Sequence, residues 1–259
     1  MSDFHTIDVH RSEGLVRLTL NRPDAANGIN AEMARELAAA AAACDDPTVK
    51  VVVITGAGRF FSAGGDLKDF ASAPHRGRHL KGVADDLHRA ISTLARCDAV
   101  VITAVNGAAA GAGFSLAVLG DLTLAAESAS FTMAYTRVGL TPDGSATYLL
   151  PRLVGMARAK ELMLTNRRLS AQDALQWGLV TEVVADDALA TRADELATAM
   201  LATSGGANGG VKALLHDSFG NGLETQMEAE GRLIAQRAES TDGREGVDAF
   251  LAKRTPDFA

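Results

Sequence analysis

Two short apolar runs in the sequence each lead into a turn rich in glycine. Residues 51–55 are all valine, isoleucine or threonine and precede the glycine-rich segment 62–68, and residues 100–105 precede the glycine-rich segment 106–113. Runs of this kind are typical of strands buried between two layers. A turn without bulky side chains lets backbone N–H groups face a cleft, and two such turns side by side can hold an oxygen that becomes negative during a reaction. The sequence therefore predicts an oxyanion hole.

The composition is that of an ordinary soluble globular chain. Its 259 residues are 47% hydrophobic and 22% charged, which allows a sizeable core. The net charge of -7 argues against nucleic acid as a partner, because phosphate binding needs a concentrated basic surface. No apolar run reaches membrane-spanning length, and two isolated cysteines, Cys44 and Cys97, are typical of a reducing compartment. We expect a cytoplasmic protein that binds neither nucleic acid nor a membrane.

Strand and helix patterns alternate along most of the chain. A helix is expected over residues 83–95, after a mobile segment at residues 71–80. This alternation predicts an α/β core in residues 1–195. Residues 196–259 are predicted to form a helical region, in which the glycine-rich stretch 205–210 separates two helices. Amphipathic helices at the end of a chain often cover a neighbouring subunit, so we expect an oligomer.

Neither glycine-rich turn matches a phosphate-binding loop. The patterns Gly-x-x-x-x-Gly-Lys-Ser/Thr and Gly-x-Gly-x-x-Gly are absent after both strands, which disfavours nucleotide-dependent chemistry. His75 and His79 have helical spacing, but Arg76 and Arg78 lie among them in an expected loop. Because no third ligand is suggested, we predict no metal site.

Three segments resemble the signature segments of the crotonase (enoyl-CoA hydratase/isomerase) superfamily, in the same order: residues 62–68, 104–113 and 139–144. Residues 244–254 resemble the tail of some of its isomerases. The resemblance implies a crotonase-like ββα spiral core with a C-terminal α-helical region that builds homotrimers, often paired as hexamers. It also implies an acyl-CoA substrate, with no cofactor beyond the coenzyme A of that substrate.

The resemblance further implies roles for residues of both glycine-rich turns. Gly65 and Ala112 match the two positions whose N–H groups form the oxyanion hole, and alanine keeps its N–H. Donors held in place are needed because a thioester α-proton is otherwise too weakly acidic to be removed at neutral pH. The predicted substrate-binding residues around these donors are Ala63, Gly64, Asp66, Leu67, Lys68, Gly111 and Ser115.

The acidic residues indicate which reaction the resemblance implies. The family's hydratases use two glutamates, and the matching positions are Ser115 and Tyr135, neither of which can act as a carboxylate base. Asp143 matches an aspartate of several isomerases. A single carboxylate above an oxyanion hole can take a proton from one carbon of an enoyl thioester and return it to another. The favoured interpretation is an enoyl-CoA isomerase with Asp143 as acid/base and Tyr135 as a secondary candidate.

Other interpretations stay open. In the family's 4-chlorobenzoyl-CoA dehalogenases the matching aspartate is a nucleophile and a histidine assists water, which here implies Asp143 and His88. His88 lies in a helical run and also fits a packing residue. Asp143 also fits a first-turn helix residue, because Thr141 and Pro142 are typical of a helix start. Hydration by another arrangement of water and a non-catalytic binding homologue are further alternatives, and the acyl group is left open.

Overall fold

The larger of two β-sheets forms the centre of the computed structural model, which describes residues 4–258. Its six strands are β1 (Ile7–Ser12), β2 (Leu15–Leu20), β3 (Val51–Gly56), β5 (Val100–Val105), β7 (Leu122–Ala126) and β10 (Glu182–Val184), which neighbour one another in this order. β1 pairs antiparallel with β2, and every later pair is parallel. The strands predicted at residues 51–55 and 100–105 are confirmed as β3 and β5, which lie buried inside the sheet.

After each of the strands β3, β5 and β7, the chain enters a second, smaller sheet. Its strands are β4 (Phe60–Ser62), β6 (Ala108–Ala110), β8 (Ser130–Thr132) and β9 (Leu169–Ser170), in this order. β4, β6 and β8 run parallel, and β9 is antiparallel to β8. Strands β3, β5 and β7 are each followed by one strand of the small sheet and then by helical structure, so ββα turns stack into a spiral. This repeat confirms the predicted α/β class.

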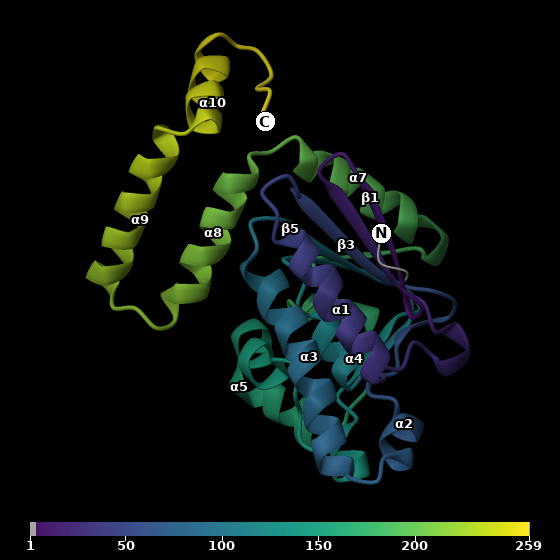
Figure 1. Cartoon of the computed structure of the whole chain (residues 1–259). Helices are drawn as coiled ribbons and strands as arrows, with labels where there is room; N and C mark the ends of the chain where they lie inside the picture. Colours follow the sequence, from purple (N-terminus) through teal and green to yellow (C-terminus); the bar gives the residue numbers. More distant parts are fainter. Residues whose placement is uncertain (1–3, 259) are drawn as a thin grey trace.

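Helices surround the two sheets (Figure 1). Helices α1 (Ala31–Cys44) and α3 (Arg76–Arg96) pack against each other, and α7 (Leu189–Leu201) packs along β3, β5 and β7. The boundary predicted after residue 195 lies inside α7. The other helices of the core are α2 (Leu67–Ser72), α4 (Ala112–Ala117), α5 (Ala146–Thr165) and α6 (Ala171–Gln176).

Helix α3 begins earlier than the sequence indicated. The segment 71–80 was predicted to be a mobile loop, whereas α3 starts at Arg76, so that prediction was wrong. The start has no strong local signal, because no side chain caps it and Gly77 lies in its first turn. A tertiary contact holds it instead, since the imidazole Nε2 of His79 lies 2.7 Å from the carboxylate of Asp69 on α2.

Three further helices extend away from the core (Figure 1): α8 (Gly205–Ser218), α9 (Leu223–Ala238) and α10 (Thr241–Leu251). The prediction that residues 205–210 separate two helices was wrong, because this stretch forms the first turns of α8. Its glycines permit close packing. A Cβ at Gly209 would lie 1.9 Å from the carboxylate of Asp98, and a Cβ at Gly210 would lie 3.0 Å from Leu233 on α9.

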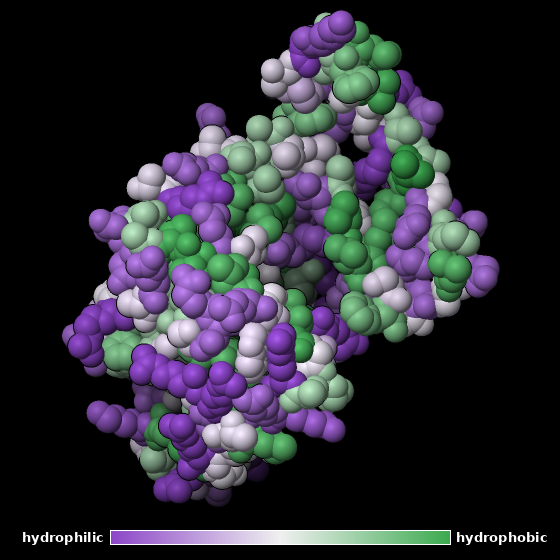
Figure 2. Space-filling view, turned by 180° about the vertical axis from the view of Figure 1, so that it is seen from behind, coloured by the Kyte–Doolittle hydropathy of each residue, from purple (hydrophilic) through white to green (hydrophobic). Residues whose placement is uncertain are grey.

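Large apolar side chains are exposed along these projecting helices, as the hydrophobic colouring in Figure 2 shows. Within residues 4–258, no helix combines the length and the apolar character needed to cross a membrane. A large exposed apolar surface of this kind is typical of a protein–protein contact. The side chains that are more than half exposed are Val211, Leu215, Phe219, Leu223, Met227, Ile234, Val247, Phe250 and Leu251.

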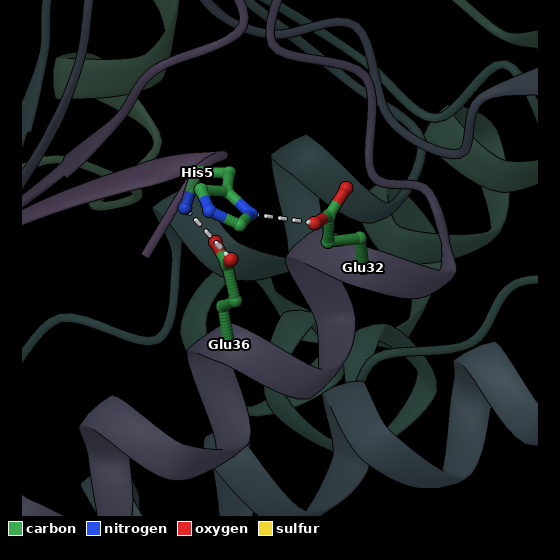
Figure 3. Close-up of side chains that lie close together, drawn as sticks. All are labelled: His5, Glu32 and Glu36. Carbon is green, nitrogen blue, oxygen red and sulfur yellow. Dashed lines mark hydrogen bonds and ion pairs between the residues drawn. The ribbon is translucent and has the colours of Figure 1, made fainter. Parts of the chain in front are cut away.

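A cluster of one histidine and two glutamates fastens the start of the chain to α1 (Figure 3). The Glu36 carboxylate accepts hydrogen bonds from the N–H groups of His5 and Thr6 at 2.8 and 2.9 Å, and His5 Nδ1 lies 3.1 Å from Glu32. Burial acts to raise the pKa of Glu36, but the bonds from His5 and Thr6 outweigh it and hold the pKa below its usual value. These contacts give the cluster a structural role at the edge of β1.

Candidate active site

An apolar cavity of about 370 Å³ opens between α2, α3 and the segment 134–143. Few polar side chains line this cavity, and they include those of Tyr135 and Asp143. Both glycine-rich turns form part of its wall. A concave, mostly apolar site with a few convergent polar groups is the usual setting for small-molecule binding. The apolar walls are formed by Phe70, Leu80, Val83, Leu87, Val138 and Leu140.

The first glycine-rich turn follows β4 and presents the N–H of Gly65 to this cavity. The N–H of Ile29 donates to the carbonyl of Gly64 at 2.7 Å, and the N–H of Asp66 donates to the carbonyl of Ile29 at 2.9 Å. In such a parallel bridge, the polar groups of the middle residue, Gly65, face away from Ile29. Gly65 lines the cavity, and its N–H has no backbone acceptor among residues 4–258.

The second glycine-rich turn follows β6 and leads into α4. Ala112 is the first residue of this helix, where N–H groups have no acceptor within the helix. Gly111 before it has φ 51° and ψ -126°, a backbone conformation that favours glycine. Gly111 and Ala112 both line the cavity. The turn therefore offers a second N–H group to the same space.

Backbone contact between Gly64 and the second turn brings the two N–H groups together. Gly64 has a φ of 90°, and a Cβ there would lie 2.6 Å from the carbonyl oxygen of Ala110 and 3.1 Å from the nitrogen of Ala112. Only glycine permits this approach. The N–H groups of Gly65 and Ala112 thus open into one cavity, an arrangement suited to an oxygen on which negative charge develops.

Asp143 supplies the carboxylate of the cavity. The alternative that it opens a helix is wrong, because α5 begins only at Ala146. Gly144 and Ser145 separate Asp143 from α5, and both have a positive φ (61° and 68°), which interrupts helical geometry. The side chain of Asp143 is 29% exposed and lines the cavity. It is therefore available to a molecule bound there.

Two hydroxyl groups hold Asp143, those of Ser115 and Tyr135. The Tyr135 hydroxyl donates to Asp143 Oδ1 at 2.6 Å, and the Ser115 hydroxyl donates to the backbone carbonyl of Asp143 at 3.0 Å. The two hydroxyl oxygens lie 3.3 Å apart. Burial and the adjacent carboxylate of Asp143 raise the pKa of Tyr135. Tyr135 therefore stays a neutral donor to Asp143.

His88 supports the same segment from α3. Its Nε2 accepts a hydrogen bond from the N–H of Gly144 at 3.0 Å. This bond requires a lone pair on Nε2, so the ring proton of neutral His88 lies on Nδ1. The same Nε2 is 3.7 Å from Asp143 Oδ2, which is longer than a hydrogen bond. The structure thus brings Asp143, Tyr135, Ser115 and His88 together.

The residues predicted to bind substrate divide into two groups. Ala63, Leu67 and Gly111 line the cavity together with Gly65 and Ala112. The other group forms no part of this wall and comprises Gly64, Asp66, Lys68 and Ser115, of which Lys68 is exposed on α2. Gly64 and Ser115 are buried beneath the cavity wall and support it. Gly64 makes the backbone contact with the second turn, and Ser115 donates its hydroxyl hydrogen bond to Asp143.

Asp66, predicted to bind substrate, has two partners within the protein. Its carboxylate caps α2 by accepting from the N–H groups of Lys68 and Asp69, and it pairs with the Arg22 guanidinium at 2.9 Å. Burial acts to raise the pKa of Asp66, but the bonds from Asp69 and Arg22 outweigh it and keep the pKa below its usual value. The pair fixes the turn that carries Gly65.

The apolar walls escaped the sequence reasoning, although part of their signal is present. Phe70 lies directly over Gly65, where a Cβ would come within 2.6 Å of its ring. Nothing in the sequence near Phe70 indicates that contact. By contrast, the cavity-lining residues Leu80, Val83 and Leu87 of α3 follow the three- and four-residue spacing of one helix face. That stripe could have been recognised by extending the predicted helix toward Arg76.

Comparisons with known proteins identify relatives of this chain. Residues 10–259 match the family model described as enoyl-CoA hydratase/isomerase. The chain is 41% identical to the 1,2-epoxyphenylacetyl-CoA isomerase of Escherichia coli strain K12, over 96% of each chain, and 40% identical to a probable enoyl-CoA hydratase of Rhodobacter capsulatus, over 98% of each. It is also similar to the crystal structure of an enoyl-CoA hydratase from Bacillus anthracis, with a TM-score of 0.92, 32% identity and coverage of 98% of this chain and 99% of that one.

The raised pKa of Tyr135 predicts a missing tyrosinate signal. The chain has two tyrosines, and an ordinary tyrosine loses its proton near pH 10. We expect the folded protein and its Tyr135→Phe variant to show equal tyrosinate absorbance up to about pH 11. Because the unfolded chain loses this proton first, stability from Tyr135 declines as pH rises above about 10. A smaller absorbance change in Tyr135→Phe, with both proteins folded by circular dichroism, would contradict the assignment.

Proposed function

Because the chain belongs to the enoyl-CoA hydratase/isomerase family, we propose that it is an enoyl-CoA isomerase, which moves a carbon–carbon double bond within an acyl-CoA thioester. One observation carries the proposal: Asp143, the one acidic residue of the cavity wall, lines the same apolar cavity as Gly65 and Ala112, whose N–H groups have no backbone acceptor within residues 4–258. The name of the Escherichia coli relative, an isomerase of an acyl-CoA, supports the same class.

The two N–H groups supply the electrostatic part of the reaction. Removal of a proton next to the thioester carbonyl places negative charge on the carbonyl oxygen. With that oxygen between the N–H groups of Gly65 and Ala112, the enolate forms in an apolar setting where fixed donors are stronger than in water. Loss of one donor of this kind costs roughly 3 to 4 kcal/mol of transition-state stabilisation.

Asp143 supplies the proton transfer. Its carboxylate takes a proton from the α-carbon of a 3-enoyl thioester, the electrons of that C–H bond form the conjugated enolate, and the same proton returns to the γ-carbon to give the 2-enoyl thioester. Tyr135 engages Asp143 Oδ1, which leaves Oδ2 as the oxygen for this transfer. The reaction needs no cofactor beyond the coenzyme A of the substrate.

Two alternatives receive less support from the same contacts. A two-carboxylate hydration lacks its partners, because Ser115 and Tyr135 stand at those positions and bond to Asp143. A dehalogenase-type hydrolysis needs a histidine that activates water. Nε2 of His88, the ring nitrogen nearest to Asp143, is already engaged by the N–H of Gly144. Isomerisation uses one carboxylate and no water, and therefore fits this site best.

At the cavity mouth, Ala63 and Leu67 are exposed beside Gly65, which suits the entry of the pantetheine arm of coenzyme A. Lys68 lies next to them on α2 and is exposed. We place Lys68 near a phosphate of the coenzyme A portion of the substrate. Its ammonium forms no ion pair within residues 4–258, and a lysine attracts phosphate as a point charge that needs no single geometry. The Asp66 carboxylate acts through the turn rather than by touching substrate.

We also propose that α8, α9 and α10 assemble the chain into trimers or hexamers, because their exposed apolar side chains are unfavourable in water. Sedimentation equilibrium should give three or six times the chain mass of 26.9 kDa. Phe250, which is 82% exposed, should matter for assembly and little for the fold of one chain. We expect Phe250→Glu to shift the equilibrium toward smaller species, and a wild-type monomer at micromolar concentration would contradict the proposal.

Replacement of the carboxylate tests the proposed reaction. We expect Asp143→Asn to lower the conversion of 3-enoyl-CoA to conjugated 2-enoyl-CoA by about 100- to 10,000-fold, because the amide cannot accept the proton. Absorbance of the conjugated thioester measures the rate, and calorimetry should show that the variant still binds a saturated acyl-CoA.

Asp187→Asn serves as the matched control, because Asp187 is exposed and lies outside the cavity wall. This variant should keep the wild-type rate. Undiminished isomerisation by Asp143→Asn would exclude Asp143 as the acid/base. Halide release from a halogenated aryl-CoA, or hydration of a 2-enoyl-CoA, faster than isomerisation would favour the corresponding alternative.

A further inference from the structure

A second cavity, of about 290 Å³, adjoins the main one between α2, the start of α3 and residues 138–140. Most of its wall is shared with the main cavity, namely Leu67, Phe70, Gly77, Leu80, Val138 and Leu140. The two residues that belong to the second cavity alone are Ala71 and Arg76. The second cavity is therefore a continuation of the first, entered past a shared apolar wall.

Arg76 is the one charged residue in the wall of this second cavity. Its guanidinium forms no ion pair with any residue in the range 4–258, and its hydrogen bond, to the carbonyl of Ala71, is 3.5 Å long. The nearby acid on α2, Asp69, is engaged by His79 instead. Lys81, the cation in the wall of the main cavity, pairs with Asp85. Arg76, which is exposed, thus leaves an unneutralised positive charge in the otherwise apolar wall of the second cavity.

Gly77 keeps the passage open. It lines both cavities, and a Cβ built on it would meet no atom within 4 Å. A glycine in the first turn of a helix is less favourable than alanine, so its presence has a cost to α3. Gly77 is exposed, and its place in both walls puts it where the two cavities meet. A side chain at this position would displace no neighbour.

From these contacts we infer that the second cavity is a subsite for the distal end of the acyl group, and that Arg76 binds a carboxylate there. The favoured ligands are acyl-CoA thioesters of dicarboxylic acids, whose far end is anionic. A guanidinium suits this task because it binds a carboxylate through two parallel N–H groups. The inference rests on the proposed function only in taking an acyl-CoA as the ligand of the main cavity.

Isothermal titration calorimetry with two unreactive thioesters of equal length tests the role of Arg76. Octanoyl-CoA ends in a methyl group, and the mono-thioester octanedioyl-CoA ends in a carboxylate. We expect the wild type to bind octanedioyl-CoA about fivefold more tightly than octanoyl-CoA, which is the gain that a partly exposed ion pair gives. Arg76→Gln should remove this preference. Arg78→Gln is the matched control, because Arg78 is exposed on the same helix, forms no ion pair within residues 4–258 and lines neither cavity.

A second pair of variants tests the passage. Gly77→Leu should weaken the binding of both eight-carbon thioesters relative to butanoyl-CoA, because Gly77 lines both cavities and a leucine there reduces the space where they meet. Gly82→Leu is the control, since Gly82 lies on the same helix, a Cβ there also meets no atom within 4 Å, and it lines neither cavity. It should leave the relative affinities unchanged.

The outcomes separate the subsite from the reaction. Equal binding of octanoyl-CoA and octanedioyl-CoA by the wild type, or a preference that survives Arg76→Gln, would overturn the carboxylate site. Wild-type affinities in Gly77→Leu would overturn the passage. These thioesters do not react, so their binding is measured independently of isomerisation. If the protein failed to isomerise enoyl-CoA, the proposed function would be contradicted, but the binding result would still hold.

Discussion

The backbone of Gly64 lies against the backbone of Ala110 and Ala112, and the rest of the site depends on this contact. A Cβ on Gly64 would come within 2.6 Å of the Ala110 carbonyl, so no other residue permits it. The contact joins two consecutive ββα turns of the spiral at the ends of β4 and β6. As a result, Gly65 and Ala112, from two segments far apart in the sequence, line one cavity.

The Asp143 carboxylate is also held in place, although it lies outside any helix or strand. Three elements of the core meet the segment of Asp143: His88 from α3 accepts from the next N–H, Ser115 from α4 donates to its carbonyl, and Tyr135 donates to its carboxylate. A carboxylate positioned in this way loses little conformational freedom when a substrate arrives. The walls around it are mostly apolar, and such a setting would strengthen the interaction of the proposed enolate with fixed donors.

Local signals in the sequence predicted those parts of the protein that neighbouring residues determine. The apolar runs at residues 51–55 and 100–105 contain their own strand signal, and the glycines after them mark the two turns, so α/β class and turn positions could be inferred. The start of α3 at Arg76 and the helical state of residues 205–210 depend on tertiary packing instead. For Asp143, the residues Thr141 and Pro142 resemble a helix start, but two positive φ angles after it delay α5, which no local pattern revealed.

The most direct test of the account is a comparison of two glycine-to-alanine variants. Gly64 and Gly139 both have a positive φ, but a Cβ at Gly139 meets nothing within 4 Å, whereas at Gly64 it meets the backbone of the second turn. The measurement is α-proton exchange of a saturated acyl-CoA in deuterated water, with thermal melting as a check on folding. We expect Gly64→Ala to lower the rate of α-proton exchange by about 100-fold or more, which is the size of effect that loss of an oxyanion donor has. The exchange rate of Gly139→Ala should stay within about threefold of wild type. Equal exchange by the two folded variants would contradict the claim that this backbone contact builds the site.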